Sequence, residues 1–196
     1  ANAINAQPDE IIFTSSGSES NNMVLKGVLR SGDHFITSSY EHPAIMKVLP
    51  YLESQNIDIT LIKPDHNGMI QPADIEENIQ ENTRLISIMW VNNELGTINP
   101  VFEISSIAKE KNVLFHSDAV QALGKIEINT EDIPVDYLSM SAHKLYGPKG
   151  VGALYKRGGT KLEPLIHGGG QESNLRASTE NVGGIGGFGM AAELST

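Results

Sequence analysis

Cysteine is absent from the 196 residues of this chain. Within these residues the absence excludes disulfides, thiolate metal sites, iron–sulfur clusters and a thiol nucleophile. Long hydrophobic runs are missing as well, because stretches such as residues 85–91 are far shorter than the ~20 apolar residues of a membrane helix. The sequence therefore predicts a protein with no membrane partner, which we expect in the cytoplasm.

Basic side chains are the scarcer of the two charged classes. The chain has 14 lysines and arginines against 24 aspartates and glutamates, and its net charge is −10. The basic residues are scattered singly, whereas surfaces that bind nucleic acid carry clustered positive charge. Nucleic acid is therefore not an expected partner. The 39% of hydrophobic residues can form a buried core of about one large domain.

Short β-branched runs alternate with helix-like stretches along most of the sequence. The expected strands cover residues 11–14, 34–37, 58–62, 85–91, 113–117, 137–139 and 152–155. The expected helices cover residues 18–29, 44–54, 72–81 and 104–111. Strands that are apolar almost throughout are typical of parallel sheets buried on both faces. We therefore expect an α/β fold, with a mostly parallel sheet and helices on both faces.

Glycine is concentrated late in the chain, where twelve of the 19 glycines lie from Gly150 onward. The glycine-rich tail, residues 168–196, is the least sheet-like part of the sequence. It is predicted to be a loop-rich surface segment, or a backbone that closely approaches a ligand or a neighbouring subunit.

Lys144 lies in the most specific segment, which runs from Ser141 and His143 to a Gly-Pro-Lys-Gly turn. A short apolar strand precedes it, and ligands of open α/β sheets collect at the carboxyl ends of strands. Most lysines are surface charges. The small and imidazole neighbours of Lys144 permit the partial desolvation that favours Schiff-base chemistry.

Asp118 ends another apolar strand, and Gln121 follows one turn later. An aspartate at this edge of a sheet is suited to pair with a ring nitrogen that must stay protonated, as a cofactor pyridinium requires. The alternative for Asp118 is a helix N-cap for the segment that begins at Ala119. Gln121 is placed to reach the same ring.

Residues 14–21 link the first expected strand to a helix with small hydroxyl residues and one glycine. Backbone N–H groups of Gly17 and Ser18 at a helix N-terminus are suited to bind an anion. A simple cap is the alternative.

Two further polar residues follow expected strands. His42 precedes a helix, and its ring is suited to stack on a bound aromatic group; a partly exposed loop histidine is the alternative. Asn93 follows the most hydrophobic strand, where a turn residue is the alternative.

In this order, the segments resemble pyridoxal phosphate enzymes of aminotransferase fold type I, class V, and most closely the cysteine desulfurases. The resemblance covers essentially the whole chain and rests on residues 14–22, 41–43, 91–96, 116–121, 141–150, 168–172 and 176–181. Ser16, Ser18 and Ser178 depart mildly from the residues usual in the family, since they keep hydroxyl or backbone donors.

The resemblance implies a role for each candidate. Lys144 forms the Schiff base with pyridoxal 5'-phosphate, and Lys144 or His42 removes the substrate α-proton. Asp118 keeps the pyridine nitrogen protonated, while His42 stacks on the ring. The remaining cofactor-binding residues divide between the ring hydroxyl (Asn93 and Gln121) and the phosphate (Gly17, Ser18, Ser141 and His143). Family dimers also place a threonine of the neighbouring subunit on the phosphate, and Thr179 holds the matching position.

The resemblance further implies that L-cysteine is converted to L-alanine, with its sulfur passed to an enzyme cysteine and then to an acceptor protein for iron–sulfur cluster or thio-cofactor synthesis. The chain itself has no cysteine. We therefore expect residues 1–196 to be a cofactor-binding large domain, truncated at both ends, that lacks the small domain with the nucleophilic cysteine and the arginine that binds the substrate carboxylate. The parent protein is expected to be a homodimer.

Two alternatives remain open at this stage. Another class V activity, such as selenocysteine lyase or an aminotransferase, would use the same Lys144 and Asp118. The chain alone is also compatible with a folded but catalytically inert module, and we expect it to be inactive in sulfur transfer.

Overall fold

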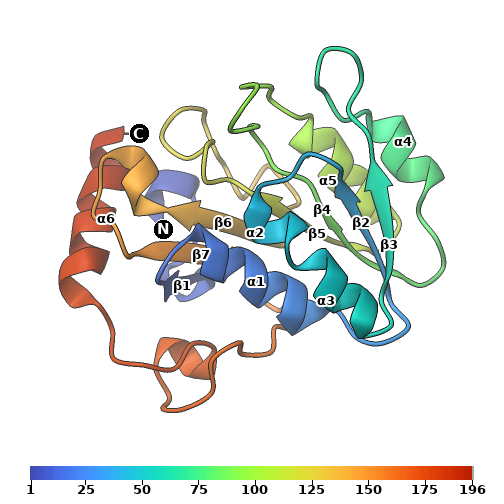
Figure 1. The fold of residues 1–196 in the computed structure, drawn as a ribbon. Helices are drawn as coiled ribbons and strands as arrows, with labels where there is room; N and C mark the ends of the chain where they lie inside the picture. The colour runs from blue at the N-terminus through green and yellow to red at the C-terminus, as the bar shows by residue number, and fades with distance from the viewer. Residues whose placement is uncertain (196) are drawn as a thin grey trace.

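The computed structural model describes residues 1–195 and contains one seven-stranded sheet flanked by helices (Figure 1). The strand order is β1-β7-β6-β5-β4-β2-β3. All neighbouring strands are parallel except β7, which is antiparallel to β1 and to β6. The mostly parallel α/β sheet predicted from the sequence is confirmed. The strands are β1 (Ile11–Thr14), β2 (His34–Ser38), β3 (Asp58–Ile62), β4 (Thr83–Ser87), β5 (Leu114–Asp118), β6 (Tyr137–Ser141) and β7 (Gly152–Lys156).

Helices cover both faces of the sheet. The α-helices are α1 (Gly17–Val28), α2 (Pro43–Met46), α3 (Leu49–Ser54), α4 (Pro72–Glu77), α5 (Val101–Glu110) and α6 (Val182–Ser195). Short 3-10 helices are η1 (Asn2–Ile4), η2 (Pro8–Glu10), η3 (Ala142–Leu145) and η4 (Glu172–Asn174). None of the helices within residues 1–195 is long and apolar enough to cross a membrane.

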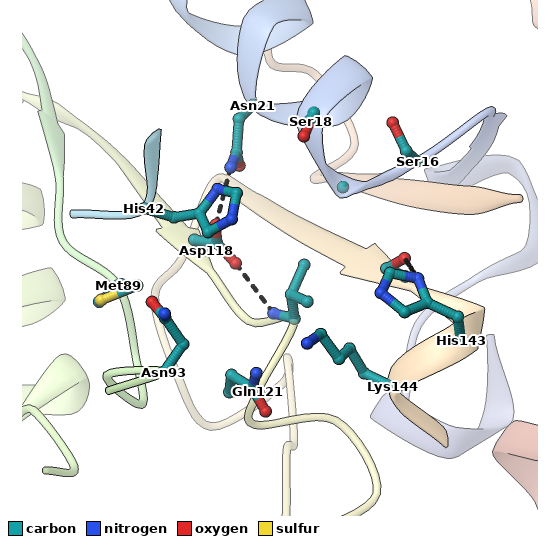
Figure 2. Close-up of a pocket in the computed structure, with 13 residues that line it drawn as sticks. Ser16, Ser18, Asn21, His42, Met89, Asn93, Asp118, Gln121, His143 and Lys144 are labelled. Atoms are coloured by element: carbon teal, nitrogen blue, oxygen red, sulfur yellow. Dashed lines mark hydrogen bonds between the residues drawn. The ribbon is translucent and has the colours of Figure 1, made fainter. Parts of the chain in front are cut away.

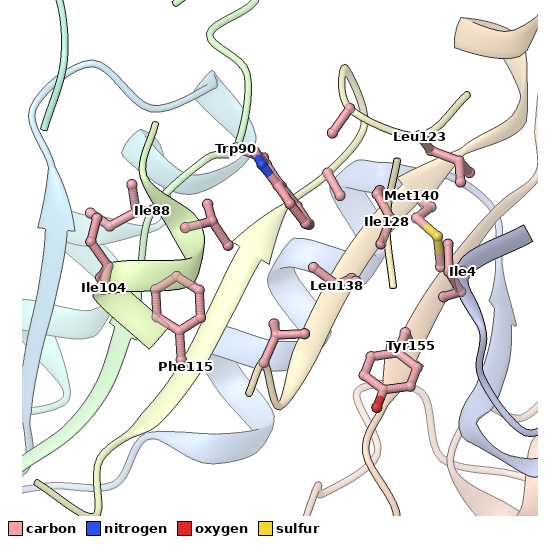
Figure 3. Packing of buried hydrophobic residues seen from close by; sticks show 14 of the residues in the cluster. Ile4, Ile88, Trp90, Ile104, Phe115, Leu123, Ile128, Leu138, Met140 and Tyr155 are labelled. Atoms are coloured by element: carbon pink, nitrogen blue, oxygen red, sulfur yellow. The ribbon is translucent and has the colours of Figure 1, made fainter. Parts of the chain in front are cut away.

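Alternate residues of the strands supply two separate cores. Phe35 and Leu85 pack with α1, α2 and α3 on one face, whereas their neighbours Ile36 and Ile86 pack with α4 and α5 on the other. Figure 3 shows part of the second core, in which Phe115 of β5 lies close to Ile104 of α5. Period-two alternation with apolar residues on both sides explains why these strands are hydrophobic almost throughout.

Three of the expected elements differ most from the sequence prediction. β4 ends at Ser87 rather than Val91, although Trp90 still donates a backbone hydrogen bond to Asp118 (3.0 Å). The expected helix 44–54 is two helices, because Pro50 lacks an N–H group and its ring disfavours helix continuation. α4 ends at Glu77, four residues before the expected end.

The glycine-rich tail is only partly a loop. Residues 168–181 are irregular apart from η4, as predicted, but residues 182–195 form α6, so the loop prediction is wrong there. The helix forms despite its glycines because Phe188 is buried in the core. Gly187 also permits close packing, since a Cβ atom there would lie 2.7 Å from Cγ of Pro148.

Candidate functional site

A pocket of about 180 Å³ lies at the edge of the sheet where β1, β2, β4, β5 and β6 end (Figure 2). Its volume suits a small molecule. Every cofactor-binding residue predicted from the sequence lines this pocket except Thr179. The lining residues are Ser16, Gly17, Ser18, Asn21, His42, Met89, Asn93, Asp118, Val120, Gln121, Ser141, His143 and Lys144.

One end of the pocket is suited to bind an anion. Ser16 caps α1, and its hydroxyl accepts a hydrogen bond from the Glu19 N–H (3.2 Å). The N–H groups of Gly17 and Ser18 have no acceptor within the helix, because the first N–H groups of an α-helix never do. A Cβ atom on Gly17 would lie 2.6 Å from Cγ2 of Val120, so only glycine fits without a shift.

Two further polar residues complete this end. The Ser141 hydroxyl lies 2.8 Å from Nδ1 of His143, at the junction of β6 and η3. Burial lowers the pKa of His143, and the positive charges of Lys144 and Lys149 lower it further. The arrangement therefore combines neutral donors with nearby positive charge, which favours a phosphate group.

Asp118 forms the buried floor of the pocket. Its Oδ2 accepts a hydrogen bond from Nδ2 of Asn21 (2.7 Å), and its Oδ1 accepts one from the Val120 N–H (3.0 Å). Burial raises the pKa of Asp118, although both hydrogen bonds and His42 act in the opposite direction. A cation beside this carboxylate would offset the cost of burial. The helix-cap alternative is wrong, because residues 120–125 form turns rather than a helix.

His42 stands over the floor of the pocket between Asn21 and Asp118 (Figure 2). It is the N-cap of α2, and its Nδ1 accepts a hydrogen bond from the Ala44 N–H (3.0 Å). An accepting Nδ1 fixes the orientation of the ring and leaves Nε2 available to the pocket. The half-buried ring thus has a defined pose, unlike an ordinary loop histidine.

Lys144 projects from η3, the short helix that follows β6, and its amine is directed into the pocket (Figure 2). Gln121 lies at the same side, where its Oε1 accepts a hydrogen bond from Lys125 (2.5 Å). Asn93 is exposed in the loop after β4 and lies across the pocket from His143. The pocket therefore has an amine at its mouth, a carboxylate at its floor and an anion site at one end.

Thr179 lies apart from this pocket. It lines a second cavity with Thr14, Ser15 and Arg176, on the other side of the β1–α1 connection. Arg176 forms an ion pair with Glu19 of α1 (2.8 Å), which ties the segment before Thr179 to the anion end of the pocket. Within one chain the structure does not bring Thr179 to the other predicted residues.

Four lining residues were not predicted from the sequence: Ser16, Asn21, Met89 and Val120. Asn21 follows Gly17 by four residues on α1, and this helical spacing was a usable signal. Met89 had no such signal, because it sits inside an apolar run that resembled a continuous strand.

Comparisons with known proteins agree with this geometry. A family model described as Aminotransferase class-V matches residues 1–196. A relative named Cysteine desulfurase IscS from Dictyoglomus turgidum is 54% identical over 199 residues, which cover 100% of this chain and 50% of the relative. A relative named Cysteine desulfurase, mitochondrial, from Saccharomyces cerevisiae is 45% identical over 99% of this chain and 40% of the relative.

Solved structures give the same result. The structure titled "SspA in complex with cysteine" superposes with a TM-score of 0.95 at 45% identity, over 98% of this chain and 57% of its own. The structure titled "NIFS-LIKE PROTEIN" has a TM-score of 0.95 at 44% identity, over 100% of this chain and 55% of its own. The chain spans about half the length of the curated relatives it matches. Its sheet has the architecture of the fold type I pyridoxal phosphate enzymes, and the chain belongs to the class-V aminotransferase family.

Proposed function

We propose that the pocket binds pyridoxal 5'-phosphate and that Lys144 attaches it covalently. The observation that carries this proposal is the donor set of one small pocket: an amine, a buried carboxylate and a helix N-terminus. A protonated pyridine nitrogen suits Asp118, whose buried carboxylate already receives two neutral donors. A phosphate group suits Gly17, Ser18, Ser141 and His143. The residues present therefore fit this cofactor.

Each remaining side chain has a proposed task in binding. The ring of His42 would contact the cofactor ring, and the hydrogen bond from the Ala44 N–H to its Nδ1 fixes its orientation for this role. Asn93 and Gln121 address the ring hydroxyl. When bound, pyridoxal phosphate acts as an electron sink for carbanion chemistry at amino acids. Lys144 or His42 then holds the proton taken from the α-carbon of the substrate.

For the whole protein we propose cysteine desulfurase activity, with L-cysteine as substrate and L-alanine as product. Residues 1–196 would be its cofactor-binding large domain. Support comes from the similarity to proteins named cysteine desulfurase along the full length of this chain. The substrate sulfur would pass to a cysteine thiolate outside these residues, because the chain has none. A sulfur-acceptor protein would receive it for iron–sulfur cluster or thio-cofactor synthesis in the cytoplasm.

We propose a homodimer in which Thr179 binds the cofactor phosphate of the neighbouring subunit. Its position outside the pocket of its own chain supports this arrangement. The Arg176–Glu19 ion pair then connects the phosphate site of one subunit with the segment that serves the other.

The cofactor assignment is tested with pyridoxal phosphate and borohydride. We expect the mixed protein to turn yellow, borohydride to bleach the colour, and mass spectrometry to place the added mass on Lys144. Lys149→Ala, at an exposed lysine of the same loop, is the matched control and keeps the modification. If Lys144→Ala gives the spectrum and the labelled peptide of the wild type, the assignment is wrong.

The sulfur-transfer assignment is tested with L-cysteine. The chain loaded with pyridoxal phosphate is expected to release no sulfide in the presence of a reductant, because no thiol is present to accept the sulfur. Catalytic turnover by residues 1–196 alone would contradict the requirement for an enzyme cysteine.

A further inference from the structure

Glu41 is a buried carboxyl that joins two walls of the pocket. Its side chain is 5% exposed. Oε1 accepts a hydrogen bond from the Ser38 hydroxyl at the end of β2 (2.5 Å) and another from the N–H of Met89 (3.0 Å). Met89 lines the pocket, as does His42, the next residue after Glu41. One carboxyl oxygen therefore holds the segment after β2 against the segment after β4.

Met89 depends on this contact because β4 ends two residues earlier, at Ser87. Three of its atoms are held by side chains. Its N–H donates to Glu41, its carbonyl accepts from Nδ2 of Asn99 (2.8 Å), and its sulfur accepts from Nδ2 of Asn92 (3.3 Å). Asn92 also donates to the carbonyl of Tyr40 (3.2 Å). Side chains thus hold the backbone of Met89, while its neighbours Ile88 and Trp90 keep backbone hydrogen bonds to His116 (3.2 Å) and Asp118 (3.0 Å) of β5.

The second carboxyl oxygen of Glu41 is buried and has no hydrogen-bond partner among residues 1–195. The ion pairs within these residues, Lys111–Glu76 and Arg176–Glu19, do not involve Glu41. An unpaired buried carboxylate is far more costly than a neutral acid in the same place. Burial raises the pKa of Glu41 to about 8, and the charge of Asp118 acts in the same direction.

We propose that Glu41 is a positioning residue that works as a neutral acid, fixing His42 and Met89 at the pocket wall while Asp118 remains the anion of the pocket floor. The purpose of this arrangement rests on the proposed function, because the cofactor ring is what His42 and Asp118 would contact. The two carboxyls cannot both be ionised cheaply in one desolvated region. The hydrogen bonds that Asn21 and Val120 donate to Asp118 favour its ionised form, whereas the second oxygen of Glu41 has no such donor.

The protonation of Glu41 is tested by the pH dependence of unfolding. The titratable groups that interact with it are Asp118 and Tyr40, and both remain in Glu41→Gln, which imitates the neutral acid. Between about pH 5.5 and 7.5, Glu41 is ionised in the unfolded chain but protonated in the folded chain. The equilibrium unfolding constant of the wild type, divided by that of Glu41→Gln, should therefore rise by roughly tenfold per pH unit.

The exposed Glu53 of α3 supplies the control. For Glu53→Gln, the ratio of the wild-type unfolding constant to that of the variant is expected to stay constant between these pH values. A level ratio for Glu41→Gln as well would show that folded Glu41 is ionised, and the proposal would be overturned.

The positioning role is tested through the imidazole signals of His42 in NMR spectra of the protein without pyridoxal phosphate. Glu41→Gln keeps the acceptor for Ser38 and Met89, so the His42 signals should stay at their wild-type positions. Glu41→Asp is one methylene shorter and should move them. Should Glu41→Asp fail to fold, Ser38→Ala removes one of the two donors and takes its place.

The proposal is wrong if the His42 signals move equally in the Gln and Asp variants, or in neither. The first result would mean that His42 depends on the negative charge of Glu41. The second would mean that Glu41 does not position His42. Because no measurement uses the cofactor, these outcomes are independent of the borohydride test of Lys144, and either proposal can fail alone.

Discussion

Loss of stability at mildly acidic pH is expected from His116, at the centre of the sheet. Its imidazole is fully buried, with Nδ1 2.7 Å from the Ser87 hydroxyl and Nε2 2.9 Å from the Ser139 hydroxyl. The three residues belong to β4, β5 and β6, so the neutral ring links three adjacent strands. Burial lowers the pKa of His116 from 6.5 to about 3.

The sign and size of the effect follow from proton linkage. Between pH 6.5 and 3 the unfolded chain binds a proton at this histidine and the folded chain does not, so acid favours unfolding. With about 1.36 kcal/mol per pKa unit, the contribution of His116 to the free energy of unfolding falls by about 2 kcal/mol between about pH 7.5 and pH 5. Below about pH 3 the total loss approaches ~5 kcal/mol.

Urea unfolding of the wild type and His116→Gln at both pH values measures this contribution. The variant cannot titrate at this position. The free energy of unfolding of the wild type minus that of His116→Gln should therefore be about 2 kcal/mol smaller at pH 5 than at pH 7.5. His66→Gln, in an exposed loop, is the control for substitution of a histidine. A difference between wild type and His116→Gln that is the same at both pH values would refute the linkage argument.

Two further substitutions test packing and polar contacts around the sheet. Gly152→Ala places a Cβ atom 2.5 Å from the carbonyl carbon of Ser16, so we expect a loss of ~1–3 kcal/mol in urea unfolding and weaker pyridoxal phosphate binding in a spectroscopic titration. Unchanged values would show that the cap of α1 tolerates displacement. Arg157→Lys removes the planar guanidinium that donates to three carbonyls of residues 130–135 at 2.8 Å, and should cost ~2 kcal/mol with faster amide exchange in that loop. Amide exchange as slow as that of the wild type in residues 130–135 would contradict this role of Arg157.

The sheet was predictable because its strands are short, β-branched and apolar on both sides. The same property hid where β4 ends, since Ile88, Met89 and Trp90 are as apolar as the strand itself. What ends the strand is a set of contacts distant in sequence, chiefly the side chains of Glu41 and Asn99. No local pattern encodes these contacts. The helix α6 was missed for the opposite reason, because its glycines disfavour a helix that packing around Phe188 stabilises.

The predicted site residues other than Thr179 share one property, which is that they follow the carboxyl ends of strands that run in the same direction. The pattern extends to the strands themselves, since five of the six strands that run in the same direction end in a buried polar residue: Thr14, Ser38, Ser87, Asp118 and Ser141. β3 is the exception and ends in Ile62 at the edge of the sheet, away from the pocket.

Each of these buried polar ends has a side-chain partner, and four of the five partners were not among the predicted site residues. Their partners are, in the same order, Ser20, Glu41, His116, Asn21 and His143. A buried polar group without a partner costs about 1–3 kcal/mol, so a polar strand end requires one. Of the five partners, His143 was singled out as a site residue because it adjoins Lys144. A sequence can therefore indicate where an apolar strand turns polar at a pocket, and it places near partners such as Glu41 and His143 a few residues further on. The distant partners, Asn21 for Asp118 and His116 for Ser87, come from other elements and emerge only with the fold.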